Sequence, residues 1–202
     1  HWFTKGLWFR NFSHLDLAFD ESDFSRIFNC ANGTAFRAPS KIVCMTHEPR
    51  LSRALRTMLN TQRVASLGTL NTDGSPFVSM VPFAIEPDSA CLIVHVSLLA
   101  VHTRNLLSNP AVSVMVMQAE VAGAPVHDLP RVSIVGTAAR LQPESGGWQL
   151  ARSVYLARFP EAQPMTELGD FSFVAIEPVS ARQVAGFGIA RPVEAEDLVA
   201  LF

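Results

Sequence analysis

The sequence predicts a mainly β protein in which antiparallel strands form a closed or partly closed barrel with a few short helices. Strand-forming stretches follow one another through tight turns, of which Asp73-Gly74 is the clearest. A doubly wound parallel sheet would need a crossover helix after each strand, and this chain has too few helical stretches for that. An antiparallel barrel therefore fits the order of the elements best.

The first part of the barrel is predicted as one helix and three strands. Apolar residues recur at helical spacing over Leu51–Leu59, which indicates a short amphipathic helix. Strand formers then fill Val64–Asn71 and Pro76–Ile85 on the two sides of the Asp73-Gly74 turn. Cys91–Ser97 follows as the third strand.

The second part of the barrel begins after Ser97, where the spacing of the apolar residues changes back to a helical period. Leu99–Leu107 is predicted as a short helix that Asn109-Pro110 terminates. The stretches beyond it are read as two long strands, a helix, and one or two final strands, at residues 111–118, 131–142, 148–159 and 170–184.

Composition excludes several classes of protein. With 49% hydrophobic and 17% charged residues over 202 residues, the chain has enough apolar material for one packed domain. A net charge of -2 gives no broad field for nucleic acid or anionic lipid, and no apolar run reaches the roughly 20 residues of a membrane-spanning helix. Three cysteines without a CxxC pair are typical of a reduced cytoplasmic protein.

The first 44 residues differ from the rest of the chain. Both lysines, Lys5 and Lys41, lie there with seven of the 14 phenylalanines, and the composition shifts at Met45. We predict a folded domain at residues 45–202, preceded by an atypical N-terminal extension at residues 1–44. The extension would be a peripheral segment from an upstream start, an expression remnant, or a partner-binding arm.

The common catalytic motifs are missing. The sequence has no GxGxxG, GxxxxGK[ST], HExxH or GxSxG pattern. Cys91, His95 and His102 are possible metal ligands, and the two-residue period of a strand puts Cys91 and His95 on one face. A structural cysteine and a hydrogen-bonded histidine are the simpler interpretation, so no metal site is expected. No residue presents itself as a catalytic acid, base or nucleophile.

The stretch Ser97–Pro110 has the ingredients of an anion site. A strand ends in a polar residue, and the following helix carries His102, Thr103 and Arg104 in its first turns. Free backbone N–H groups and the helix dipole favour a phosphate there, and all three side chains are hydrogen-bond donors. The alternative is an ordinary capped helix with a solvated arginine.

Several ordered motifs resemble one family. VASLGTLNTDGSPFVSMVPF, VHTRNLLSNPAVSVMV and RVSIVGTA, between Val64 and Ala138, resemble the pyridoxamine 5'-phosphate oxidase-like split-barrel flavoproteins. YLARFPEA, LGDFSFVAIEP and GFGIA, between Tyr155 and Ala190, resemble the subgroup of heme-utilization proteins, although this chain ends without the further C-terminal domain of that subgroup. The resemblance implies a six-stranded antiparallel split barrel that binds FMN between the two subunits of a homodimer.

Site residues carried over from this resemblance fall into four groups. One strand would follow the flavin and its ribityl chain, the next would flank the same cofactor, and the helix start would meet the phosphate, while Arg131 would contact the flavin from the neighbouring subunit. The strand along the flavin comprises Ser79, Met80, Val81 and Pro82. The flanking strand contributes Val96 and Ser97, and the helix start contributes His102, Thr103 and Arg104.

The sequence also differs from the pyridoxamine 5'-phosphate oxidases at several positions. The oxidases usually have a basic residue where Ser79 stands and a lysine where His102 stands, and they end in an Arg/His substrate motif that this chain lacks. Vitamin oxidase activity is therefore not expected. His127, in the loop APVHDLP, is a candidate heme ligand, although a solvated loop histidine is the simpler interpretation.

We therefore predict an FMN-dependent oxidoreductase of unknown small-molecule substrate. The alternatives are a heme-binding or heme-utilization protein, a noncatalytic cofactor carrier, and a barrel that has lost its cofactor and serves as an interaction module.

Overall fold

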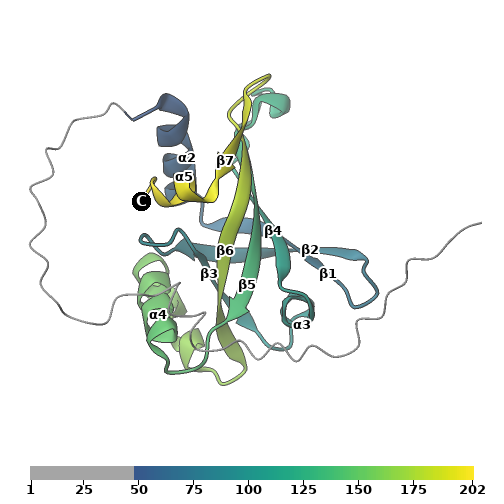
Figure 1. Ribbon diagram of the computed structural model, residues 1–202, viewed down its shortest axis with the longest axis vertical. Coiled ribbons are helices and arrows are strands. Elements are labelled where there is room, and N and C mark those ends of the chain that lie inside the picture. The colour runs from purple at the N-terminus through teal and green to yellow at the C-terminus, as the bar shows by residue number, and fades with distance from the viewer. Residues whose placement is uncertain (1–47) are drawn as a thin grey trace, which may run out of the picture. The chain divides into compact units, whose positions relative to one another are not determined.

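The computed structural model describes residues 48–202 as a closed antiparallel barrel with short helices around it (Figure 1). The predicted extension at residues 1–44 lies outside the described residues and stays a prediction. No helix in the part of the chain that the structure describes is long and apolar enough to cross a membrane.

Seven strands form one sheet in the order β3-β2-β1-β4-β5-β6-β7, and all neighbours are antiparallel. A further pairing of β3 with β6, from Leu92↔Ile176 to Ser97↔Phe171, closes six of the strands into the barrel. β7 extends the sheet beyond β6. The strand bounds are β1 Val64–Leu70, β2 Pro76–Ile85, β3 Leu92–Ser97, β4 Ala111–Met117, β5 Arg131–Arg140, β6 Phe171–Val184 and β7 Ala190–Glu194.

The helices were predicted to within a few residues at their ends. They are α2 Arg50–Thr61, α3 Val101–Ser108 and α4 Gly146–Arg158. Sequence analysis missed α5 Ala195–Val199 and two 3-10 helices, η1 Val126–Asp128 and η2 Pro160–Glu167. η1 and α5 are too short to show a helical period in the sequence, and η2 is a 3-10 helix with Pro164 inside it, so it lacks the α-helical period.

The last predicted strand region is a single strand, although Pro178 lies inside it. Proline has no N–H for the ladder and is tolerated at a bulge. The pairing of β5 with β6 shifts here, from Val135↔Ser180 to Gly136↔Pro178, which leaves Val179 as the extra residue. β6 therefore continues through the proline for 14 residues and pairs with β3, β5 and β7.

The barrel interior is an aliphatic core. Inward-facing residues such as Leu67, Val94 and Ile134 are fully or almost fully buried. Apolar residues of α2 and α5, including Leu55 and Leu198, belong to the same core. Burial of such side chains supplies the main stabilising free energy of the domain, at roughly 25 cal/mol for each Å² removed from water.

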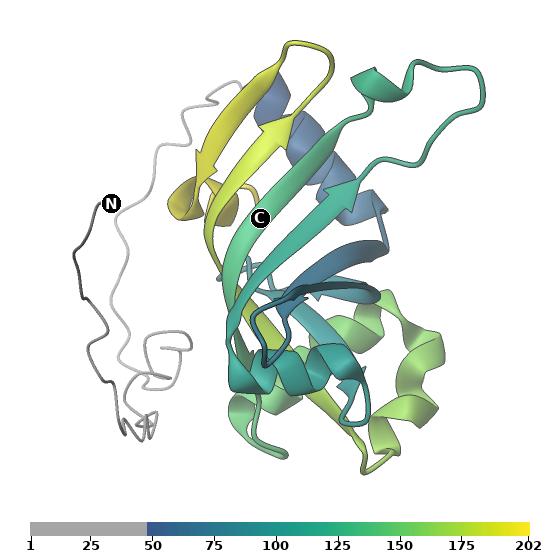
Figure 2. The ribbon, with the colours of Figure 1, turned by 90° about the vertical axis from the view of Figure 1, so that its right-hand side faces the viewer.

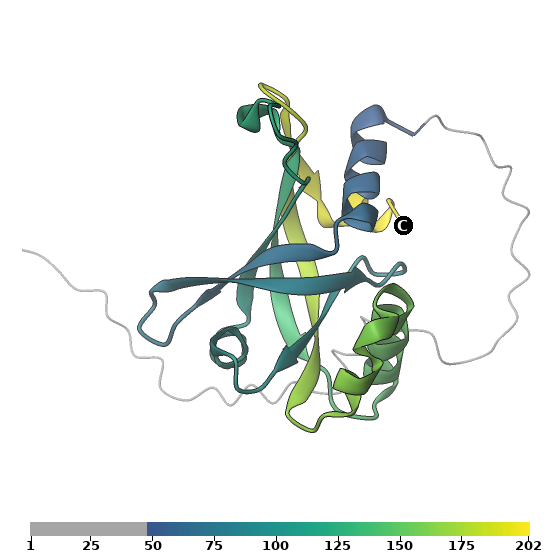
Figure 3. The ribbon, with the colours of Figure 1, turned by 180° about the vertical axis from the view of Figure 1, so that it is seen from behind.

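A second apolar layer lies outside the barrel wall, between α4 and strands β3 and β6. There Ile93, Phe173 and Tyr155 are buried without belonging to the interior core. Figure 3 shows α4 on this side of the barrel, below α2. Seen from the direction of Figure 2, β4 and β5 cross the front of the molecule, with α2 behind them.

Candidate functional site

The turn from β3 into α3 is built around Ser97. The Thr103 hydroxyl donates to the Ser97 carbonyl at 2.7 Å, and the Ala100 N–H donates to the same oxygen at 3.1 Å. The Ser97 hydroxyl accepts from the Leu99 N–H at 3.2 Å. Thr103 is fully buried, so in this structure its hydroxyl proton fixes the start of the helix and is not free for a phosphate.

Asn105 holds α3 against the barrel. Its buried side-chain amide donates to Thr69 Oγ1 at 3.1 Å and to Asn71 Oδ1 at 2.8 Å, both on or next to β1. Without these acceptors the amide would be buried and unpaired, which would lower the stability of the fold by about 1–3 kcal/mol. The helix start is therefore rigidly placed against β1.

The other two predicted phosphate donors differ from each other. Burial lowers the pKa of His102 below its usual value, so the imidazole is neutral at pH 7. Arg104 is exposed, and its guanidinium has no hydrogen-bond or ion-pair partner among the described residues. Arg104 thus supplies the free positive charge at this helix start.

Asp170 is a charged group at this site that sequence analysis missed. Its carboxylate accepts a hydrogen bond from the Ser97 hydroxyl at 3.3 Å, and its carbonyl accepts one from the Leu98 N–H at 2.7 Å. The pairing of Ser97 with Phe171 in the β3–β6 ladder brings Asp170 here from 73 residues away. The closure of the barrel therefore adds a negative charge beside the predicted anion site.

The four predicted β2 residues do not share one face. Val81 is 2% exposed in the barrel core, whereas Met80 is 65% exposed on the outside. Ser79 alternates to the same side as Val81, and its hydroxyl oxygen is buried without a hydrogen-bond partner. Pro82 is partly buried, and the predicted cofactor neighbour Val96 belongs to the interior core.

Two separate features fit parts of a polar ligand such as FMN: the orphaned Ser79 hydroxyl, which faces the barrel interior, and the free Arg104 guanidinium, which lies in solvent. Leaving a buried hydroxyl unpaired costs about 1–3 kcal/mol, which a bound acceptor would relieve. The neutral His102 and the nearby Asp170 carboxylate weaken the fit to a dianionic phosphate. The site thus has fewer free positive donors than the sequence predicted.

The outer surface of β2, β1, β4 and β5 forms an uncharged strip, which we call the bare face. Two rows of cross-strand neighbours make its centre: Met80, Ser66, Met115 and Ser133, and Val78, Gly68, Ser113 and Val135. Val78 is 66% and Val135 50% exposed. Exposed apolar side chains in adjoining strands, with no charge between them, are typical of a surface that binds a ligand or partner.

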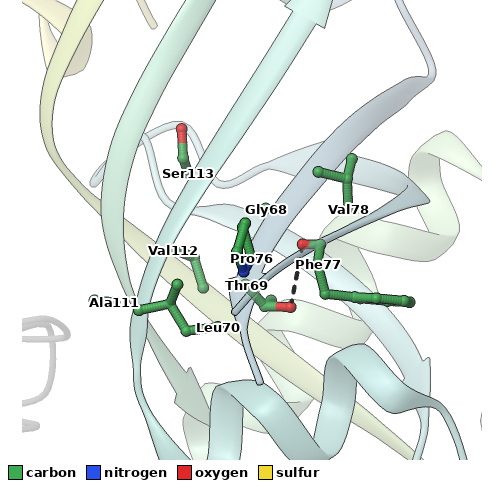
Figure 4. A pocket seen from close by; sticks show the side chains of 9 residues that line it. All are labelled: Gly68, Thr69, Leu70, Pro76, Phe77, Val78, Ala111, Val112 and Ser113. Carbon is green, nitrogen blue, oxygen red and sulfur yellow. Dashed lines mark hydrogen bonds between the residues drawn. The ribbon is translucent and has the colours of Figure 1, made fainter. Parts of the chain in front are cut away.

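A hollow of about 290 Å³ interrupts the bare face beside the β1–β2 hairpin (Figure 4). Gly68, Ala111 and Ser113 line it with small side chains, and a Cβ atom on Gly68 would lie 3.3 Å from the Ser113 carbonyl oxygen. Leu70, Pro76 and Val78 are among its other lining residues. The lining contains no charged residue.

Arg131 opens β5 at the far end of the bare face. It pairs with Met117 across β4 and is partly buried. One guanidinium nitrogen donates to the Leu129 carbonyl at 3.0 Å, which leaves its remaining N–H groups for other acceptors.

The histidines of residues 48–202 lie in three different surroundings. His95 is buried under α4, His102 is partly buried on α3, and His127 is exposed in η1. Cys91 is buried, and burial raises the pKa of its thiol. Over this range no three histidine, cysteine or carboxylate side chains gather as a metal site would require.

A sequence profile of the pyridoxamine 5'-phosphate oxidase family matches residues 51–185. Two curated relatives are named heme oxygenases. HOZ, a chloroplastic protein of Arabidopsis thaliana, is 31% identical over 188 residues, which is 90% of this chain and 56% of HOZ. HutZ of Vibrio cholerae is 28% identical over 151 residues, 74% of this chain and 85% of HutZ. The chain thus spans little more than half the length of the plant relative.

Solved structures agree with the fold. A heme-binding protein from Mycobacterium smegmatis superposes with a TM-score of 0.68 at 28% identity, covering 77% of this chain and 62% of that one. The structure of Vibrio cholerae HutZ gives a TM-score of 0.59 at 26% identity, over 64% of this chain and 91% of HutZ. A FAD-binding protein of Mesorhizobium loti, at 20% identity and a TM-score of 0.53 over 71% of this chain and 94% of its own, shares the fold.

Proposed function

Because the chain belongs to the pyridoxamine 5'-phosphate oxidase family, we propose that it is a split-barrel protein of the heme-oxygenase kind. In this proposal, heme is the substrate and binds at the margin of the bare face next to the start of α3. The observation that carries the proposal is the uncharged strip of β2, β1, β4 and β5, whose exposed Val78, Met80 and Val135 side chains suit a flat apolar macrocycle. The names of the two curated relatives support the same ligand.

The side chains at this margin match the chemistry of heme. Met80 and Val78 offer exposed apolar contact area to the porphyrin plane. The two propionates need cations, and Arg104 has an unpaired guanidinium on α3, the helix that Asn105 anchors to β1. In a homodimer, which we also propose, Arg131 of the second copy supplies the other cation.

The iron needs a ligand, and His127 is our candidate. It is the exposed histidine of the described residues, whereas the ring of His95 is packed between Phe171 and Phe173. His127 lies in the loop between β4 and β5 beside Met117 and Arg131, at the opposite end of β4 from α3, so in this proposal it reaches the heme, like Arg131, from the second copy. Oxidative opening of the macrocycle would further require molecular oxygen and an external electron donor.

FMN is the second candidate ligand, and Ser79 is the observation that favours it. The buried hydroxyl without a partner would gain an acceptor from a phosphate or a ribityl chain. Because Ser79 faces the barrel interior with Val81, a ligand group that reaches its hydroxyl would have to enter the barrel wall and could not lie wholly on the bare face. The neutral His102 and the engaged Thr103 make this the weaker proposal.

Parallel titrations with heme, FMN and riboflavin decide between the two ligands. We expect a Soret band that saturates at one heme per chain, and loss of that band over time when ascorbate and oxygen are supplied. Stoichiometric FMN binding without heme binding would replace the heme proposal by the FMN one.

Three variants locate the site. Arg104→Ala should weaken heme binding by about ten- to a hundredfold, since a charge-assisted hydrogen bond contributes roughly 1.5–3 kcal/mol. His127→Ala should shift the Soret maximum. Arg53→Ala is the matched control, because Arg53 is an exposed arginine on α2 and should leave the titration unchanged. Parental heme binding in both site variants would contradict the placement.

A further inference from the structure

Two loops form one tip of the barrel, where β5 begins and β6 ends. The β4–β5 loop carries η1, and the β6–β7 turn comprises residues 185–189. A Cβ atom placed on Gly186 would lie 3.9 Å from the carbonyl oxygen of Asp128, so the two loops lie against each other. Figures 1 and 3 both show them side by side at the top of the molecule. The pairing of Arg131 with Val184 brings them to this end.

His127 and Phe187 flank the place where the two loops meet. His127 precedes Asp128, and Phe187 follows Gly186. Each is therefore one Cα–Cα step, about 3.8 Å, from a residue of the contact. Both side chains are exposed, and Phe187, at 81%, is more exposed than any other large apolar residue of the described chain. The tip thus presents an imidazole and a phenyl ring beside each other.

Backbone hydrogen bonds give the Phe187 turn a defined shape. The Ala185 N–H donates to the Ile189 carbonyl at 2.8 Å, and the Ile189 N–H donates to the Gly186 carbonyl at 3.1 Å. Gly186 and Gly188 have φ angles of 141° and 75°, a region that glycine adopts readily. The phenyl ring is therefore held out on an ordered turn.

The rest of the β4–β5 loop is partly apolar and has a cation at its base. Val121 and Val126 are exposed, and Arg131 keeps guanidinium N–H groups beyond the one bound to a backbone carbonyl. The loop also carries the carboxylates of Glu120 and Asp128. These carboxylates disfavour a small anion, so the tip suits a ligand with an apolar body that can reach the arginine with an acidic group.

A metal-bearing apolar macrocycle matches this combination. Imidazole is a common axial ligand of heme iron. The porphyrin plane is wider than the imidazole that ligates it, so it extends over side chains next to the histidine. An aromatic ring there gains contact with the plane by stacked or edge-to-face packing and is removed from water. Phe187 is the aromatic ring in this position.

We propose that Phe187 packs against the porphyrin ring of heme beside His127 and so makes the tip favour a porphyrin over a metal ion alone. The inference rests on the heme ligation by His127 proposed above and deepens it, because it adds the residue that recognises the macrocycle. Both residues belong to one tip, so the contact does not depend on how two copies meet.

The test titrates the full chain with two probes, heme and iron-free protoporphyrin IX. Protoporphyrin has the same ring and propionates but no iron, so it reports the ring contact without ligation by His127. Phe187→Ala should weaken the binding of both probes by about tenfold, which corresponds to about 1.4 kcal/mol. His127→Ala should weaken the binding of heme alone. Absorption follows the heme titration, and fluorescence follows that of protoporphyrin.

Matched variants separate the ring contact from other effects. Phe187→Tyr keeps an aromatic ring and should retain the parental affinity for both probes. Leu168→Ala removes an exposed leucine elsewhere and should leave both titrations unchanged. Because Phe187 is exposed, Phe187→Ala should also keep the parental free energy of unfolding in urea without porphyrin. A clear fall in that free energy would overturn the proposal, since Phe187 would then support the fold.

The failure of this contact is distinct from the failure of the heme proposal. Parental affinity of Phe187→Ala for both probes, with weaker heme binding by His127→Ala, would overturn the Phe187 contact and leave the heme proposal standing. A loss confined to heme in Phe187→Ala would overturn it as well, because the effect would then be on ligation of the iron. Absence of heme binding by the unchanged protein would overturn both.

Discussion

Two outward surfaces of the same barrel wall have opposite environments. Ile93 and His95 on β3, with Phe173 on β6, point out of the barrel and are buried because α4 packs over them. Val78 and Met80 on β2 also point outward, but they are exposed by 66% and 65%. An outward apolar residue is therefore structural where a helix covers it and available to a ligand or partner where none does.

The surface that α4 covers, which we call the covered face, also shifts the pKa values of its polar groups. Desolvation lowers the pKa of His95 to about 4, and the ring lies 4.5 Å from the Phe173 ring and 5.0 Å from that of Phe171, centre to centre. Burial raises the pKa of Tyr155 to about 12. Both groups are thus neutral near pH 7. On the bare face the described side chains of the central rows carry no ionisable group at all.

Removal of Phe173 should give the largest loss of stability. Phe173→Ala deletes a fully buried ring between β6 and α4, and the free energy of unfolding should fall by about 3–5 kcal/mol. Urea unfolding followed by circular dichroism measures this change. A loss below 1 kcal/mol would mean that α4 contributes little to the covered face.

His95 should make stability depend on pH. Its pKa is near 6.5 in the unfolded chain and about 4 in the fold, so the unfolded state takes up the proton first as the pH falls. Stability should be highest above pH 6.5 and decline by up to about 3 kcal/mol between pH 6.5 and 4. Urea unfolding at several pH values tests this, and His95→Phe should remove most of the decline.

Arg158 should contribute an intermediate amount by joining α4 to α2. Its guanidinium donates to the carbonyls of Leu59 and Asn60 at 3.1 Å each, and also to that of Gln62. Arg158→Met keeps most of the stem but leaves these acceptors without the charged donor, at a cost of about 2 kcal/mol in the free energy of unfolding. Arg53→Met, at a 57% exposed side chain on α2, should change it by less than about 0.5 kcal/mol.

A charge on the bare face should have the smallest effect on the fold and a large one on binding. Met80→Glu should change the unfolding free energy of the monomer by less than about 0.5 kcal/mol, because the side chain is already in water. The same substitution should abolish the Soret band and dimer formation. Ile93→Glu, on the covered face, should leave no stable fold. Similar damage from both variants would erase the contrast between the two faces.

Much of the barrel followed from local sequence signals. The Asp73-Gly74 turn, strand alternation and the helix ended by Asn109-Pro110 predicted β1, β2, α3 and β4 with boundaries close to those found. The antiparallel barrel is confirmed, since β3 pairs with β6 and closes it. These features depend on residues near one another in the chain, where period and turn chemistry suffice.

The candidate site could be predicted only in part. The motif around His102, Thr103 and Arg104 correctly marked the strand-to-helix turn, but not that Thr103 donates to Ser97 or that burial keeps His102 neutral. Asp170 could not have been foreseen beside Ser97, because 73 residues separate them and only the β3–β6 pairing joins them. Burial and long-range pairing set both properties, and neither has a local signal.

By itself, the sequence determined the strands, their turns and the residues that alternate to each side of the wall, because side-chain direction follows from a two-residue period. Only the tertiary structure decided which outward surface α4 covers and which stays bare. That choice depends on where a helix between β5 and β6 packs after the barrel closes. It separates His95 and Phe173, which are buried under α4, from Val78 and Met80, which stay exposed.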